Sequence, residues 1–141
     1  LRSLVGSEMC IRDSHGIVEQ ARRTQFTATI LGRRRYLPDL TSSNRQRREM
    51  AERMALNAPI QGSAADIIKI AMLEVEKALA EAGLKSRTML QVHDELVLEV
   101  APGEREQLEQ IVRDRMGHAM ELAVALDVSV GVGRSWHDAA H

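Results

Sequence analysis

A histidine and two adjacent acids stand between two apolar runs, "MLQV" and "LVLEV". The runs predict two core strands, near 87–92 and 96–100, so His93, Asp94 and Glu95 fall at the tip of a hairpin. Successive strand residues point to opposite faces, so the two carboxylates can aim at one point only if the backbone turns between them. Such oxygens suit a hard dication such as Mg²⁺. The tip is therefore a candidate for two-metal phosphoryl transfer, although polar residues at a hairpin turn are also routine.

A second set of polar side chains recurs every four residues upstream: Arg53, Asn57 and Gln61. All three are hydrogen-bond donors, and the small residues 62–65, "GSAA", follow them and leave room for a backbone or a ligand. Every base pair presents acceptors in the minor groove, so donors aimed there can test pair geometry without reading sequence. The alternative is that these residues are helix caps and surface polar groups, with small residues for helix packing.

The charge of the chain is divided unevenly although its net value is only −1. Residues 15–53 contain nine arginines and four acids, whereas residues 54–141 contain eight basic and fourteen acidic side chains. Such asymmetry indicates either a basic face for a polyanion or a solvated Arg-rich helix. With 44% apolar residues but only three aromatic ones, we expect an aliphatic core. One cysteine, no membrane-length apolar run and no typical secretory signal favour a cytoplasmic protein.

The elements that must position these groups follow from periodicity and turn residues. We expect helices near 15–25, 44–56, 59–82 and 104–123, with Ser42, Ser43 and Asn44 as caps, an interruption at "NAPIQG" and a stop at Gly83. Strands are expected at 25–30, 33–37, in the hairpin, and at 127–132. The order predicts an α+β fold in which an antiparallel sheet packs against long helices. Residues 1–14, "LRSLVGSEMCIRDS", are expected to be a non-native, adapter-derived leader, or else a native, poorly ordered one.

Four blocks in order resemble the C-terminal part of family A DNA polymerases, the bacterial DNA polymerase I group. They are "TATILGRRRYLPDL", "AERMALNAPIQGSAADIIKIAM", "QVHDELVLEV" and "VGVGRSWHDAAH", and they cover most of the chain from Thr24 to His141. The resemblance implies that residues 15–141 form part of a polymerase palm with adjoining fingers-side helices. It also implies template-directed nucleotidyl transfer in DNA replication or repair.

The resemblance also assigns roles to single positions. Asp94 matches the palm aspartate that binds two catalytic Mg²⁺ ions, Glu95 a supporting acid, and His93 a residue near the primer end. The trio Arg53, Asn57 and Gln61 matches residues that touch the minor-groove side of the primer–template. The implied partners are primer–template DNA and deoxynucleoside triphosphates, and the implied whole enzyme is a monomer. The arginine run 33–35 is expected on the DNA-facing side.

Parts of the family pattern are absent from these residues. Neither the other Asp-bearing palm strand nor the fingers helix that holds the triphosphate is present, so the tip supplies one half of a metal site, and we expect the chain alone to be inactive. Two readings compete with a polymerase: a non-catalytic nucleic-acid-binding module and a structural domain without a ligand. A metal phosphohydrolase built on His93 and Asp94 is disfavoured, because the other histidines show no metal-ligand spacing.

Overall fold

The computed structural model describes residues 9–123 and 125–139, so residues 1–8 of the expected leader lie outside it. Helix α1 (Met9–Thr24) begins before the predicted start at residue 15. The expectation that residues 1–14 are a non-native leader stays a prediction. Two compact units make up the chain, Leu1–Asp66 and Ile67–His141. No helix of the described residues has the length and apolar character needed to cross a membrane.

The first unit combines α1, a small hairpin and the beginning of a long helix. Strands β1 (Phe26–Ala28) and β2 (Arg34–Tyr36) pair antiparallel with Thr27 opposite Arg35, and the short 3-10 helix η1 (Pro38–Thr41) follows. The core of this unit holds Ala21, Leu37, Leu40, Ala51 and Ala55. Alanines supply three of these five positions, so α1 and the long helix can pack closely.

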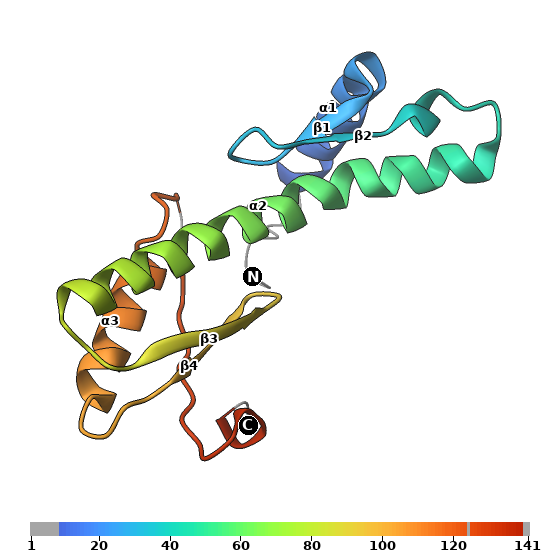
Figure 1. Cartoon of the computed structure of the whole chain (residues 1–141). Coiled ribbons are helices and arrows are strands. Elements are labelled where there is room, and N and C mark those ends of the chain that lie inside the picture. Colours follow the sequence, from blue (N-terminus) through green and yellow to red (C-terminus); the bar gives the residue numbers. More distant parts are fainter. Residues whose placement is uncertain (1–8, 124, 140–141) are drawn as a thin grey trace. The chain divides into compact units, whose positions relative to one another are not determined.

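Helix α2 (Arg45–Glu81) is one continuous helix, and the predicted interruption at residues 57–62 is wrong (Figure 1). Pro59 lies inside it and removes one backbone donor. Helical residues packed in the core on either side outweigh that loss, since tertiary packing routinely overrides local propensity. The predicted cap is confirmed, because the side-chain oxygen of Asn44 accepts hydrogen bonds from the N–H groups of Gln46 and Arg47 at 3.0 and 3.3 Å.

The end of α2 is also as predicted. Gly83 takes a positive φ of 65°, which a glycine adopts without strain. The N–H of Leu84 donates to the carbonyl of Leu79, and the N–H of Gly83 to that of Ala80. This pair of hydrogen bonds is the Schellman motif that ends many helices.

The second unit packs a hairpin and a helix against the later part of α2. Strands β3 (Arg87–Val92) and β4 (Glu95–Glu99) are antiparallel, with a bulge at Met89, and α3 (Arg105–Gly117) follows. The buried centre of this unit is Val75, Leu79, Leu108 and Val112, and the half-buried Leu96 and Leu98 of β4 pack against it. Only one face of the hairpin is therefore covered within this unit. Strands β3 and β4 are less buried than the core strands that the sequence predicted.

Glu104 joins two segments of the second unit. Its carboxylate accepts hydrogen bonds from the N–H groups of Lys85 and Ser86 and from the Ser86 hydroxyl, the last at 2.6 Å. Ser86 is buried, and its hydroxyl oxygen accepts from the N–H of Ala101 at 2.9 Å. These hydrogen bonds lower the pKa of Glu104, with the Lys85 N–H as the largest cause. The start of β3 is thus fixed to the start of α3.

Two predicted elements differ near the end of the chain. The helix expected over 104–123 ends at Gly117, because glycine is a poor helix former, and the N–H of the capping residue His118 donates to the carbonyls of Asp114 and Met116. The strand expected over 127–132 pairs with no other strand among the described residues, although Leu126, Val128 and Val130 alternate as half-buried side chains. Instead, Arg113 donates to the Val128 carbonyl at 2.8 Å. A short helix α4 (Trp136–Ala139), which the sequence did not predict, follows. The fold class, α+β with antiparallel hairpins and helices, is confirmed.

Candidate nucleic-acid and metal sites

The three residues of the acidic tip lie together at the turn of the β3–β4 hairpin. Val92 pairs with Glu95, so His93 and Asp94 form a two-residue loop. His93 has a positive φ of 51°, a conformation in which histidine is several times more frequent than most residues. Its carbonyl accepts a hydrogen bond from the Gln91 side chain at 2.8 Å. The chain therefore turns at His93 and Asp94, and Glu95 is the first residue of β4.

The carboxylates of this turn are available to a ligand. Asp94 and Glu95 are both exposed, and neither forms an ion pair within the part of the chain that the structure describes. Oxygen donors of this kind fit Mg²⁺. Across residues 9–123 and 125–139, no group of three or more His, Cys, Asp or Glu residues is placed to hold a metal ion. The turn therefore offers one carboxylate pair and no complete ligand cage.

The trio Arg53, Asn57 and Gln61 lies on one face of α2, because residues four apart on a continuous helix are neighbours. Eight helical steps place its ends about 12 Å apart, close to the rise of three to four base pairs of B-DNA. All three side chains are exposed, and none forms a hydrogen bond with another described residue. The predicted spacing is realised, but on an unbroken helix rather than around an interruption.

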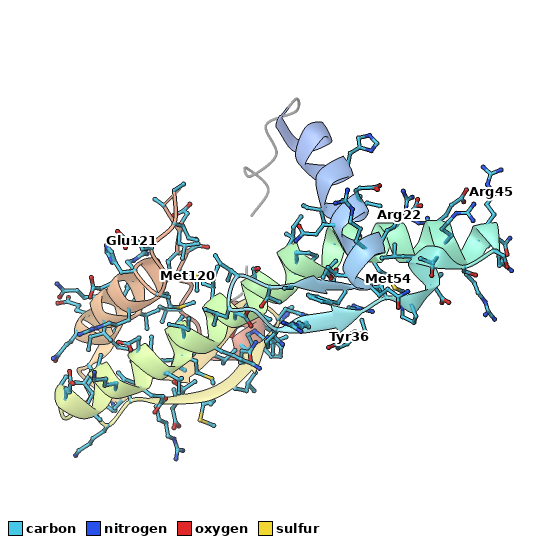
Figure 2. The ribbon with its side chains drawn as sticks, turned by 90° about the horizontal axis from the view of Figure 1, so that it is seen from above. Arg22, Tyr36, Arg45, Met54, Met120 and Glu121 are labelled. Atoms are coloured by element: carbon cyan, nitrogen blue, oxygen red, sulfur yellow. The ribbon has the colours of Figure 1, made fainter. Side chains whose placement is uncertain are left out.

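A groove of about 380 Å³ runs along the trio in the first unit. Its lining adds Arg35 of β2 and the apolar residues Met50, Met54 and Ala58 to the three donors. Met54, labelled in Figure 2, lies on α2, and its sulfur is 3.8 Å from a guanidinium nitrogen of Arg35. The groove thus combines an apolar floor with donors and positive charge.

The loop of the β1–β2 hairpin is fastened to α2 directly after the trio. Asp66 of α2, only 3% exposed, accepts hydrogen bonds from the Thr29 hydroxyl and from Nε of Arg33, both at 2.5 Å. Arg33 also donates to the carbonyl of Gly62 at 3.0 Å, and the N–H of Ile30 donates to the Ser63 hydroxyl at 2.9 Å. We call Thr29, Arg33 and Asp66 the hairpin clamp.

Gly62 makes this contact possible. A side chain at this position would collide with the methyl group of Thr29. The small residues after Gln61 were predicted to admit a backbone or a ligand, and at Gly62 the neighbour is the hairpin of the same unit.

The clamp also lowers the pKa of Asp66. The hydrogen bond from Thr29 is the largest cause that lowers its pKa, and the hydrogen bond and charge of Arg33 lower it further, against the opposing effect of burial. Sequence reasoning missed Asp66 as a functional position. The available signal was an isolated acid between Ala64–Ala65 and Ile67–Ile68, where a charge must be buried and therefore paired.

Comparisons with known proteins identify the family. A family model described as "DNA polymerase family A" matches residues 13–138, which include every predicted site residue. The chain belongs to DNA polymerase family A. The resemblance seen in four separate blocks of the sequence is thereby confirmed, and the match runs through all of residues 13–138.

Relatives and a solved structure agree with this assignment. DNA polymerase I of Mycobacterium tuberculosis is 69% identical over 125 residues, 89% of this chain and 14% of that protein. DNA polymerase I of Bacillus subtilis is 48% identical over 139 residues, 99% of this chain and 16% of that protein. The POL domain of Pol1 from M. smegmatis, solved in complex with DNA primer-template and dNTP, matches with a TM-score of 0.89 and 64% identity, covering 93% of this chain and 23% of that one. The chain thus spans about one seventh of the curated relatives' length.

Proposed function

We propose that this chain is the part of a DNA-directed DNA polymerase that contacts the primer–template and supplies one carboxylate pair to the metal site. The observation that carries the proposal is the match to the M. smegmatis POL domain, which was solved with primer-template and dNTP. In the whole enzyme, the primer 3′-hydroxyl attacks the α-phosphate of the nucleotide and pyrophosphate leaves. The partners would be primer–template DNA and deoxynucleoside triphosphates.

The trio would contact the minor groove of the duplex. Purine N3 and pyrimidine O2 are acceptors in every base pair, so Arg53, Asn57 and Gln61 can donate to a correctly formed pair of any sequence. These side chains are free, and the row that they form is roughly 12 Å long, which suits several consecutive base pairs. His93, exposed at the hairpin turn, would lie near the primer end.

Asp94 and Glu95 would hold Mg²⁺, two ions in the whole enzyme. When bound, these ions stabilise the charge on the attacking and leaving oxygens of phosphoryl transfer. The two side chains themselves provide only carboxylate oxygens at the hairpin turn. One pair cannot bridge both ions, so the 141 residues by themselves are proposed to be inactive.

The wider setting is also a proposal. The bacterial relatives named DNA polymerase I support a role in replication or repair, with the DNA in the cytoplasm. The whole enzyme is proposed to be a monomer.

A chimaera tests the catalytic proposal. Residues 15–141 would replace the matching segment of the M. tuberculosis enzyme, and nucleotide incorporation on a primed template would be measured. We expect activity in the chimaera, its loss with Asp94→Ala, and none from the isolated 141-residue chain. Asp114→Ala, an exposed acid on α3, is the matched control and should keep activity.

Two outcomes would contradict the proposal. Full activity of the Asp94→Ala chimaera would remove the metal role of this residue. Incorporation by the isolated chain, abolished by Asp94→Ala, would show that a complete site is present. A non-catalytic nucleic-acid-binding module remains the alternative: its DNA affinity would be independent of Mg²⁺ and would survive Asp94→Asn.

A further inference from the structure

The three consecutive arginines of the β1–β2 hairpin have three different surroundings. Arg33 is tied to Asp66 in the hairpin clamp. The guanidinium of Arg34 lies 4.5 Å from the centre of the Phe26 ring. Arg35 lines the groove beside the trio and touches Met54. A run that looks uniform in the sequence is therefore three separate sites.

The register of the hairpin explains this separation. Neighbouring residues of a strand point to opposite faces, and residues paired across strands share a face. Arg35 pairs with Thr27, which is buried, whereas Arg34 pairs with Ala28 on the face that also carries Phe26 and Tyr36. Only Arg35 of the two is on the face that contacts α2.

The groove around Arg35 suits an anion. Its lining contains two guanidinium groups, Arg35 and Arg53, and no acid. Neither of these arginines pairs with a carboxylate in the part of the chain that the structure describes. The larger groove of the same unit, between α1 and α2, is different: three acids, Glu19, Glu49 and Glu52, line it beside Arg22 and Arg53, and Arg22 is paired with two of the acids. Acids outnumber arginines in the larger groove and are absent from the lining of the groove beside the trio, so the groove beside the trio is the more favourable place for a phosphate.

We propose that Arg35 binds a backbone phosphate of the duplex whose minor groove the trio contacts. The inference rests on the proposed function and adds a phosphate-binding residue to it. The minor groove is about 6 Å wide, so side chains that reach its base edges are flanked by phosphates. Arg35 adjoins the row of donors, carries a permanent charge, and presents a planar fork that matches two phosphate oxygens. The guanidinium of Arg35 donates a weak hydrogen bond to the uncharged sulfur of Met54 at 3.8 Å, which orients the side chain without neutralising it.

Salt dependence of binding is the test. Fluorescence anisotropy would give the affinity of the 141-residue chain for a labelled primer–template duplex over a series of KCl concentrations. Each phosphate contact contributes about 0.9 to the slope of log affinity against log salt. We expect Arg35→Leu to reduce the magnitude of the slope by about 0.9 and the affinity about eightfold at 0.1 M salt. Arg35→Lys, which keeps the charge, should retain the slope.

Arg34→Leu is the matched control, because it removes the same charge from the adjacent residue on the other face. We expect it to leave the slope near that of the unchanged chain. Equal slopes for Arg35→Leu and the unchanged chain, or equal losses for Arg34→Leu and Arg35→Leu, would overturn the inference while leaving DNA binding intact. No duplex binding by the unchanged chain would overturn the proposed function and this inference together.

Discussion

Asp66 shows how one side chain can organise a site that it does not enter. It lies on α2 five residues after Gln61, and its two short hydrogen bonds hold the β1–β2 hairpin against that helix. Arg35 of the same hairpin lines the groove along the trio. The clamp therefore positions Arg35, and a change in the clamp should affect the groove without altering any residue in it.

The close approach at Gly62 leads to a paired prediction. Gly62→Ala should destabilise the chain by about 1–3 kcal/mol, because the added methyl group overpacks against Thr29. Gly16→Ala is the control: Gly16 is also helical, an added Cβ there meets nothing within 4 Å, and the chain should gain roughly 0.5–1 kcal/mol. Urea unfolding of both variants measures the difference. Equal effects would show that the hairpin does not press on α2.

The two lowered pKa values predict a loss of stability in acid. A carboxylate with a lowered folded pKa stabilises the fold above its ordinary value, 3.8 for Asp66 and 4.5 for Glu104, and this contribution is lost as the pH falls through the folded pKa. We expect the free energy of unfolding to fall as the pH is lowered through these ordinary values and on toward the lower pKa values of the folded state. Asp66→Asn and Glu104→Gln should each flatten this dependence. Glu81→Gln, at an exposed residue outside both networks, should not.

Continuity of α2 is the decisive feature at the scale of the elements. Were the helix broken at Pro59, Arg53 and Gln61 would belong to different helices and their spacing would not define a row. Pro59 leaves the carbonyl of Ala55 without its usual helical partner, while Ala55 itself is buried in the core. Packing thus keeps the trio on one continuous helix, although the proline at position 59 disfavours a helix there.

Pro59→Ala should therefore stabilise the chain, because it restores a backbone donor to the helix. The gain is at most about 3 kcal/mol, the cost of proline relative to alanine inside a helix. Pro38→Ala, at the start of η1 where no such donor is required, should change stability far less. Thermal unfolding followed by circular dichroism compares the two. A loss of stability in Pro59→Ala would mean that the ring makes packing contacts worth more than the hydrogen bond.

At the scale of the whole molecule, the notable feature is apolar surface exposed on the second unit. Met89 and Leu90 of β3 are 54% and 43% exposed, and each strand of this two-stranded sheet has one edge without a partner strand among the described residues. Open edges and apolar faces promote association. The β3–β4 hairpin therefore presents both an exposed apolar surface and open edges.

We expect the isolated chain to self-associate through this hairpin. Sedimentation should show a concentration-dependent increase in mass, and Leu90→Lys should reduce it, because a charge on an edge strand opposes pairing. Ile30→Lys, at an exposed apolar residue of the first unit, is the control and should not. A concentration-independent monomer with a sharp thermal transition would contradict this expectation.

The sequence by itself determined the family, the hairpin with its acidic turn, the cap and stop of α2, and the four-residue spacing of the trio. These features are local or periodic: a turn, a cap or a helix face depends on residues near one another in the chain. The α+β class followed from the order of such elements. Misjudged boundaries, at Pro59, at Gly117 and over 127–132, lie where local propensity and tertiary packing disagree.

Only the tertiary structure separated the three arginines. The three residues are of the same type, and their surroundings depend on partners that are distant in sequence. Arg33 is paired with Asp66, and Arg35 lies beside Met54 and the trio. The burial of Asp66 and the close approach at Gly62 are likewise long-range contacts. Sequence periodicity shows which face a side chain occupies, whereas the fold decides what that face meets.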